Sequence, residues 1–295
     1  MKNPTFGICA PSSYARLENF EPGLARLRAL GHDLVVHPQS YGRLRDTQLA
    51  GTAQEKIAAL YDLMADPKVD MILTACGGQT AAHILAELDY ARLTKPIIGF
   101  SDTTSLLNAA YAKTGIIQYH GPGVTWFKPD RLPDDLYQQF LDLITGANTT
   151  IPLPDAVIQK PGVAAGPLIG GNLSVFQSLL ATPYLPDLTG AILFFEDVGA
   201  ELSTLDRILN QFRLAGILDR AAGLIFGQFT DTLDTGRPFG FPVPEIIAQY
   251  TQNLKIPVVT NGPFGHTPRL ISFPVGATVT LDAHQGTPYL EIEKL

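Results

Sequence analysis

Short apolar runs alternate with amphipathic stretches through the first half of the chain. The apolar runs predict buried strands, at 6–10, 33–37, 71–75, 96–100 and 116–119. The amphipathic stretches between and after them predict helices, at 52–64, 80–89, 103–114 and 134–146. Strands and helices that alternate along a chain form a parallel sheet covered by helices on both faces, so the pattern predicts an α/β fold.

Local signals support several of these elements. Thr52 and Glu55 stand at capping-box spacing at the start of the first predicted helix. Gly115 follows the third helix, where glycine is a typical C-terminal stop. At the other end of the sequence, two alternating stretches predict a β-hairpin, at 277–283 and 288–295.

The pattern changes near residue 150. The stretch 147–167 contains four prolines and little helical periodicity. We therefore expect one domain at 1–150 and a second, less regular α/β domain at 151–295.

Composition narrows the class of protein. Hydrophobic residues make up 45% of the 295 residues, which is enough for a sizeable core, and the net charge of −7 gives no electrostatic basis for binding nucleic acid. No apolar run approaches the roughly 18 residues of a membrane span, and the first residues lack the pattern of a signal peptide. Two cysteines without metal-ligand spacing argue against a disulfide scaffold or a zinc site. A cytoplasmic protein is expected.

Small polar residues and glycines follow four of the predicted strands. The sequences are "APSS", "CGGQT", "GFSDTT" and "YHGPG". Ligands of open parallel sheets bind beyond the carboxyl ends of the strands, so this edge is the expected site.

Ser101 has two interpretations. It lies between a strand and a helix, where Ser, Asp and Thr commonly cap the first turn. The same context presents a nucleophilic serine on a sharp turn, although "GFSDT" lacks the second glycine of the hydrolase elbow. If Asp102 or Thr103 caps the helix instead, the Ser101 hydroxyl is left free.

A serine nucleophile needs a base and an orienting carboxylate. His120, at a predicted strand end, and His266, in a loop rich in glycine and proline, are equally placed candidates for the base. Glu196 and Asp197 end a strongly apolar run, which is unusual for acidic residues without a partner. There are two interpretations: the acidic residues simply mark the end of a strand, or one of them holds an imidazole.

The turn "CGGQT" at 76–80 also has two interpretations. Backbone N–H groups near Gly77 and Gly78 are suited to receive the oxyanion of a tetrahedral intermediate, or the glycines only serve a tight turn. A phosphate cradle is not expected, because the Gly-Lys-Ser/Thr ending is missing. Cys76 is a nucleophile candidate, but a cysteine after a buried strand is usually inert.

Seven segments in order resemble the LD-carboxypeptidase family of serine peptidases, which includes murein tetrapeptide carboxypeptidases and microcin C self-immunity peptidases. They are "APSS" at 10–13, "CGGQTAAHILAELDY" at 76–90, "IIGFSDTTSLLNAAYAKTG" at 97–115, "HGPG" at 120–123, "GGNLSVFQSLLATPYLPD" at 170–187, "ILFFEDVG" at 192–199 and "GPFGHTPRLISFPVG" at 262–276.

The resemblance implies a fold and a set of catalytic residues. A flavodoxin-like N-terminal domain would carry the nucleophile Ser101, and a swivelling C-terminal domain would carry Glu196 and the base His266. In this interpretation His120 becomes a structural or cleft-lining residue, and the N–H groups near Gly77 or Gly78 and of Asp102 hold the oxyanion. The family acts without a metal or organic cofactor on small peptide or peptidoglycan-fragment substrates, and its members are often homodimers.

One departure from the family leaves the substrate open. Murein enzymes of the family commonly have Arg-Gly-Gly-Tyr-Gly where this chain has "CGGQT", so recognition of a terminal carboxylate by that arginine is in doubt. The turn is closer to the microcin-immunity branch, and Trp126 either stacks on a flat substrate group or simply covers the sheet. Three functions are weighed: an LD-carboxypeptidase that releases D-alanine from murein tetrapeptide, a microcin-immunity-like peptidase, and a non-catalytic binding protein.

Overall fold

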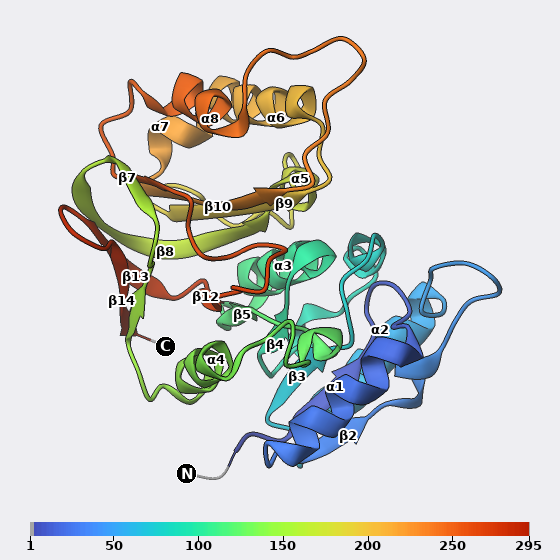
Figure 1. Ribbon diagram of the computed structural model, residues 1–295. Coiled ribbons are helices and arrows are strands. Elements are labelled where there is room, and N and C mark those ends of the chain that lie inside the picture. The colour runs from blue at the N-terminus through green and yellow to red at the C-terminus, as the bar shows by residue number, and fades with distance from the viewer. Residues whose placement is uncertain (1–2, 295) are drawn as a thin grey trace.

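The computed structural model describes residues 3–294 and contains two β-sheets with helices around them (Figure 1). The strands of the first sheet are β1 (Phe6–Cys9), β2 (Leu34–Val36), β3 (Met71–Thr74), β4 (Ile97–Gly99), β5 (Gln118–His120) and β12 (Phe273–Val275). The strands of the second are β6 (Thr150–Pro152), β7 (Val157–Lys160), β8 (Gly162–Asn172), β9 (Ile192–Val198), β10 (Gly223–Thr230), β11 (Val258–Thr260), β13 (Thr278–Ala283) and β14 (Tyr289–Lys294).

Eight α-helices and five short 3-10 helices connect these strands within the described residues. The α-helices are α1 (Leu17–Ala29), α2 (Ala53–Ala65), α3 (Thr104–Thr114), α4 (Asp134–Thr145), α5 (Leu173–Gln177), α6 (Leu202–Leu214), α7 (Ile217–Arg220) and α8 (Val243–Thr251). The 3-10 helices are η1 (Pro38–Tyr41), η2 (Ala81–Ile84), η3 (Tyr90–Arg92), η4 (Ser101–Thr103) and η5 (Val124–Trp126). None of the helices in this part of the chain combines the length and apolar character needed to cross a membrane.

The first sheet confirms the predicted α/β fold. Its strands run in the order β2-β1-β3-β4-β5, all parallel, which is the flavodoxin-like order. The edge strand β12 comes from the second half of the chain and pairs antiparallel with β5. The carboxyl ends of β1, β3 and β4 therefore lie beside one another, with their following loops at one edge of the sheet.

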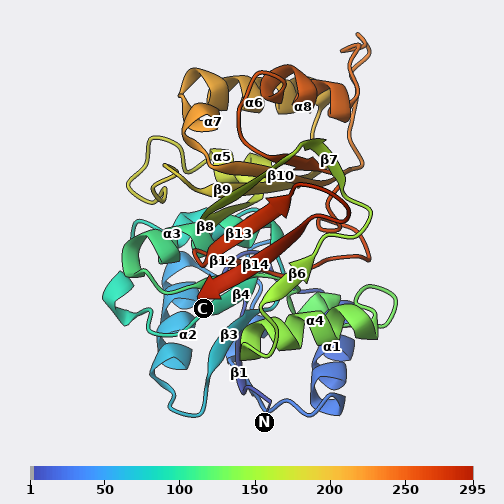
Figure 2. The same cartoon turned by 90° about the vertical axis from the view of Figure 1, so that its left-hand side faces the viewer.

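The second sheet lies above the first in the views of Figures 1 and 2 and is covered by its own helices. Its central strands β8, β9, β10 and β11 are parallel, whereas β13 and β14 form the antiparallel hairpin that the sequence predicts. Helices α6, α7 and α8 cover its outer face, and α3 lies between the two sheets (Figure 1). The division into domains at residue 150 stays a prediction, and β12 crosses it.

Several predicted helix ends are confirmed. Thr52 and Glu55 form both hydrogen bonds of a capping box at the start of α2. Gly115 ends α3 with a φ of 70°, a conformation that glycine adopts without strain.

The predicted helix at 80–89 is wrong. This stretch forms the short 3-10 helices η2 and η3, and Thr80 provides no side-chain cap to η2. The Thr80 hydroxyl instead donates to the Ser12 carbonyl oxygen at 3.0 Å and accepts from Lys56 at 2.9 Å. Ile84 and Leu85 still reach the core, so the apolar spacing reflects burial without a regular helix.

Candidate active site

Ser101 lies on a sharp turn at the carboxyl end of β4. Its φ of 60° is uncommon for a residue other than glycine, and Phe100 before it is extended. A Cβ atom built on Gly77 would lie 3.0 Å from Ser101 Cβ and 3.3 Å from Ser101 Oγ. The glycine therefore leaves the space directly beside the Ser101 hydroxyl free of side chain.

Two hydrogen bonds connect Ser101, His266 and Glu196. Ser101 Oγ lies 3.0 Å from Nε2 of His266, and Nδ1 of His266 lies 2.8 Å from Oε2 of Glu196. A carboxylate is only an acceptor, so Nδ1 carries the imidazole proton and Nε2 is left to accept the proton of the serine hydroxyl. Ser101 and His266, which are 165 residues apart in the sequence, thus meet at one place.

The Glu196 carboxylate is fully buried within β9, two residues before the strand ends, whereas 17% of the His266 side chain is exposed. Asn172 donates from Nδ2 to Glu196 Oε1 at 3.3 Å. The orientation of this amide follows from its Oδ1 atom, which accepts the backbone N–H of Val175 at 3.1 Å. Gly265, with a φ of 132°, lies so close that a Cβ there would be 3.3 Å from Glu196 Oε2.

Asp197 shares the Asn172 amide with Glu196, since Asn172 Nδ2 also lies 3.3 Å from Asp197 Oδ1, but its other partners differ. Its carboxylate accepts the backbone N–H and hydroxyl of Ser174 at 2.9 and 2.6 Å, and the N–H of Val198 at 2.8 Å. It has no hydrogen bond to a histidine. Between the two acidic residues that the sequence left open, only Glu196 reaches His266.

Three backbone N–H groups beside Ser101 are free to bind a ligand. Within residues 3–294, those of Gly77, Gly78 and Asp102 have no acceptor. Gly78 has a φ of 149° and lies against Ser12 and Ser13, where a Cβ would come within 2.5 Å of both hydroxyl oxygens. Such unpaired donors suit an oxygen that gains negative charge.

The expected capping role of Asp102 or Thr103 is wrong. The buried Asp102 carboxylate accepts the N–H of Ala81 at 2.7 Å and the hydroxyl of Ser12, so it stabilises the neighbouring turn. The Thr103 hydroxyl donates to the Phe100 carbonyl oxygen at 2.9 Å. The Ser101 hydroxyl is nevertheless free of any capping bond, because α3 begins without a side-chain cap.

A buried polar network under the 76–80 turn was missed by the sequence analysis. The ammonium of Lys56, from α2, reaches Thr80, and Thr80 in turn reaches Ser12. Burial lowers the pKa of Lys56, and the Asp102 carboxylate acts in the opposite direction. A sequence signal exists, since Lys56 shares the helical spacing of the buried residues Leu60 and Leu63.

His120 is a core residue and does not line a cleft. Its ring is fully buried near Phe100, Phe194 and Phe273, and both ring nitrogens lack a partner among the described residues. Burial, followed by the proximity of His266, lowers the pKa of His120 to about 3. The ring is therefore neutral at physiological pH.

Cys76 and Trp126 flank the site. Burial raises the pKa of the Cys76 thiol to about 12, and its Sγ donates to the Ser13 carbonyl oxygen at 3.2 Å, so the thiol is a poor nucleophile. The Trp126 ring is half-buried and packs edge-on against Phe100 at 4.9 Å, with its centre 6.5 Å from that of His266. It is within reach of a substrate bound to His266.

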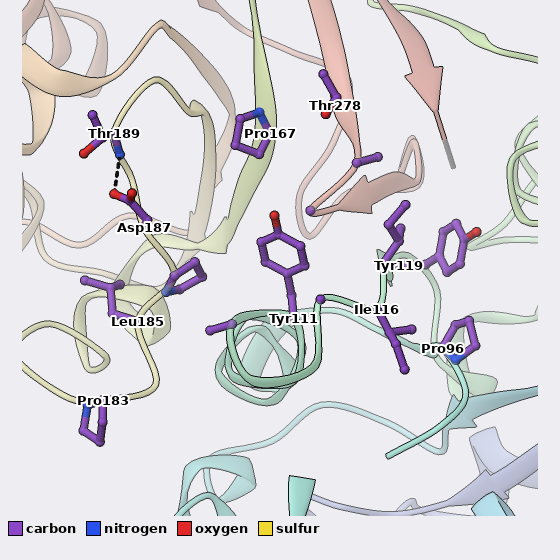
Figure 3. A pocket seen from close by; sticks show the side chains of 16 residues that line it. Pro96, Tyr111, Ile116, Tyr119, Pro167, Pro183, Leu185, Asp187, Thr189 and Thr278 are labelled. Atoms are coloured by element: carbon purple, nitrogen blue, oxygen red, sulfur yellow. Dashed lines mark hydrogen bonds between the residues drawn. The ribbon is translucent and has the colours of Figure 1, made fainter. Parts of the chain in front are cut away.

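A cavity of about 880 Å³ lies away from this site (Figure 3). Tyr111 projects into it from α3, and Pro96 and Ile116 line it just before β4 and β5. It is therefore at the amino ends of the parallel strands, opposite to the edge where such sheets bind ligands. None of Ser101, Glu196 and His266 lines it.

No group of three or more His, Cys, Asp or Glu side chains in the described part of the chain is arranged to hold a metal ion. At Ser101 the structure brings together a hydroxyl, an imidazole and a carboxylate, with backbone N–H groups nearby.

Comparison with known proteins identifies the family. Residues 6–121 match the LD-carboxypeptidase N-terminal domain, and residues 165–281 match the LD-carboxypeptidase C-terminal domain. The chain belongs to the LD-carboxypeptidase family of serine peptidases. A probable murein peptide carboxypeptidase of Bacillus subtilis is 31% identical, over 98% of this chain and 92% of its own.

Two further similar proteins carry names that correspond to the two enzyme functions weighed from the sequence. The microcin self-immunity protein MccF of Escherichia coli is 27% identical over 94% of this chain and 89% of its own length. A structure of MccF in complex with glutamyl sulfamoyl guanosine superimposes with a TM-score of 0.90, at 24% identity. The superposition covers 100% of this chain and 97% of the MccF chain. The muramoyltetrapeptide carboxypeptidase of Oxalobacter formigenes superimposes with a TM-score of 0.85 over 98% of this chain and 99% of its own, at 25% identity. The two-domain fold is shared with both.

Proposed function

We propose that the chain is an LD-carboxypeptidase that releases the terminal D-alanine of murein tetrapeptide through a Ser101-His266-Glu196 triad. The observation that carries the proposal is the unbroken pair of hydrogen bonds from Ser101 through His266 to the buried Glu196. The murein peptide carboxypeptidase relatives support the substrate class.

The geometry supports acyl transfer in two steps. His266 Nε2 takes the proton of Ser101 while Oγ attacks the carbonyl carbon of the scissile amide, and His266 then gives that proton to the leaving amine. Water, deprotonated by His266, resolves the acyl-enzyme and returns Ser101. Throughout, Glu196 holds the proton on Nδ1 and stabilises the imidazolium form of the ring.

The free N–H groups of Gly77, Gly78 and Asp102 would stabilise the oxyanion. Each is fixed by the backbone before substrate binds, so little reorganisation is needed during the reaction. Removing a single donor of this kind typically costs about 2.7–4 kcal/mol of barrier.

The second candidate is a peptidase that cleaves aminoacyl-nucleotide conjugates. Two observations favour it: the "CGGQT" turn lacks the arginine and tyrosine of the murein enzymes, and Trp126 lies beside His266. The relative MccF has been seen with aspartyl sulfamoyl adenosine and glutamyl sulfamoyl guanosine.

A paired assay separates these functions. Purified protein is offered murein tetrapeptide and aspartyl sulfamoyl adenosine in parallel, and free D-alanine and free sulfamoyl adenosine are measured. Release of D-alanine at the higher kcat/KM is expected. Release of only the nucleoside would favour the second candidate, and no release of either product would favour a non-catalytic binding protein.

Subunit association and cellular location stay predictions. A homodimer and a cytoplasmic location are expected from the family resemblance and the sequence, and sedimentation velocity tests the first of these.

A further inference from the structure

A second, smaller cavity of about 430 Å³ opens beside the 76–80 turn. Gly77, Gly78 and Gln79 form one wall, and Gly77 is in direct contact with Ser101. The opposite wall comes from the loop after β1, the start of α1, the loop at 43–48 and Arg131. A substrate bound at Ser101 can therefore extend into this space without crossing a side chain at position 77.

Three arginines line this cavity, although the whole chain has a net charge of −7. Arg16, Arg43 and Arg131 come from three separate segments, and Asp46 is the only acidic residue of the lining. The Arg43 guanidinium lies 4.5 Å from the centre of the Tyr14 ring. These four basic and acidic side chains leave the cavity with an excess of positive charge.

Two of the three arginines have no acidic partner. Arg16 lies 3.9 Å from Glu18, whereas no carboxylate of residues 3–294 lies within 4.0 Å of the Arg43 or Arg131 guanidinium. Arg131 is half-buried, and its guanidinium lies 5.5 Å from the centre of the Trp126 ring. An aromatic ring positions a guanidinium without neutralising it, so both groups keep their capacity to bind an anion.

We propose that this cavity binds a carboxylate of the substrate through Arg131 and Arg43, and this inference rests on the proposed function. A guanidinium binds a carboxylate through two parallel N–H···O bonds, which is a stronger and more directional contact than a lysine makes. The charge that murein enzymes carry at position 76, where this chain has Cys76, is thus supplied from other elements. A terminal carboxylate lies three bonds beyond the scissile carbonyl carbon, or about 4 Å, so it is near Gly77 when that carbonyl is at Ser101.

The test compares acid and amide forms of the substrate. Three peptides are used: murein tetrapeptide, the same peptide with its terminal carboxyl amidated, and the same peptide with the carboxyl of its second residue amidated. In the wild-type protein, one amidation lowers kcat/KM by about 10- to 100-fold, the usual effect of losing hydrogen bonds to a charged group. Which amidation does so identifies the carboxylate that is bound.

The arginine variants decide whether the cavity is responsible. In Arg131→Gln/Arg43→Gln the acid peptide falls to the kcat/KM of the amide, so the acid-to-amide ratio approaches one. Arg131→Lys recovers part of the ratio, because it keeps the charge and loses the planar fork. Arg220→Gln, an exposed arginine on α7, leaves the ratio unchanged. An acid-to-amide ratio in the double variant equal to that of the wild type would overturn the inference.

Binding separates this inference from the proposed function. If the wild-type protein releases no D-alanine, the proposed function fails, and the same peptides, with aspartyl and asparaginyl sulfamoyl adenosine, are titrated against Ser101→Ala. The readout is the fluorescence of Trp126, the only tryptophan. Tighter binding of an acid than of its amide, lost in the double arginine variant, supports the carboxylate site, and equal binding of every pair contradicts it.

Discussion

Glu196→Gln tests the proposed triad while keeping the shape of the side chain. Glu196 accepts from two fixed donors: His266 Nδ1 at 2.8 Å and Asn172 Nδ2 at 3.3 Å. The Asn172 amide cannot turn round without losing the bond between its Oδ1 and the N–H of Val175. A glutamine at 196 has only one acceptor oxygen, so it satisfies one of the two donors and presents its NH₂ group to the other.

The size of the expected loss in kcat depends on which of the two donors loses its acceptor. If the glutamine oxygen faces Asn172, its NH₂ faces Nδ1 and holds the ring as the tautomer with the proton on Nε2, which cannot accept the proton of Ser101. If the oxygen faces Nδ1, two NH₂ groups oppose each other in a site from which water is excluded. The corresponding acid-to-amide change in a serine protease triad lowers kcat about 10⁴-fold, which at about 1.36 kcal/mol per factor of ten is about 5.4 kcal/mol.

The assay measures kcat and KM for D-alanine release, with thermal unfolding of the same preparation. Glu196→Gln should lose about 10⁴-fold in kcat with little change in KM. Asp197→Asn is the matched control, because Asp197 bonds to Ser174, Val198 and Asn172 and not to His266. It should lower the unfolding temperature with a much smaller loss in kcat. A Glu196→Gln variant with kcat within about tenfold of the wild type would refute the reasoning.

Four further outcomes are expected. Gly77→Ala places a methyl group 3.0 Å from Ser101 Cβ, so kcat should fall about 10- to 100-fold with the unfolding temperature little changed, and unaltered kinetics would contradict the contact. In the folded state His120 binds a proton only near pH 3, whereas in the unfolded state it does so near pH 6.5. His120 therefore takes nothing from the free energy of unfolding above about pH 6.5, and it lowers this free energy progressively as the pH drops below that value. Urea titrations between these values should show a smaller slope of unfolding free energy against pH for His120→Phe, by up to about 1.4 kcal/mol per unit. Both thiols should resist Ellman's reagent at about pH 8 in the native protein and react fast in urea, because burial raises the pKa of Cys9 and Cys76 to about 12. EDTA should leave kcat unchanged, since the proposed proton transfers belong to His266, and inhibition by EDTA would call for a metal.

Much of the first sheet follows from local signals. The capping box of Thr52 and Glu55 and the glycine at 115 act within a few residues, so the sequence predicts α2 and the end of α3. The apolar runs before "APSS", "CGGQT" and "GFSDTT" predict parallel strands, and their loops do lie side by side.

Long-range partners account for what the sequence did not predict. The stretch at 80–89 has a helical spacing, but Thr80 is engaged by Lys56 and Ser12, from more than 20 residues away. Strand β12 pairs across the predicted domain boundary, with Phe273–Val275 opposite Gln118–His120, and no local signal in the sequence indicates this pairing.

The residues of the candidate site divide in the same way, into those with a local signal and those brought together only by the fold. Strand ends and apolar context nominated Ser101, Glu196 and His266, because each is locally unusual. Arg43 and Arg131 are ordinary polar residues of loops, and they become notable only where the fold brings them to one cavity.

Ser101→Ala provides the most direct test of the account. The variant is compared with the wild type and with Ser203→Ala, which changes a serine at the start of α6, by D-alanine release and by mass spectrometry of acid-quenched reactions. The account predicts a loss of at least about 10⁴-fold in kcat for Ser101→Ala, an unchanged unfolding temperature, and an acyl adduct on the Ser101 peptide in the wild type and in Ser203→Ala. Turnover retained in Ser101→Ala, or an adduct on another residue, would contradict it.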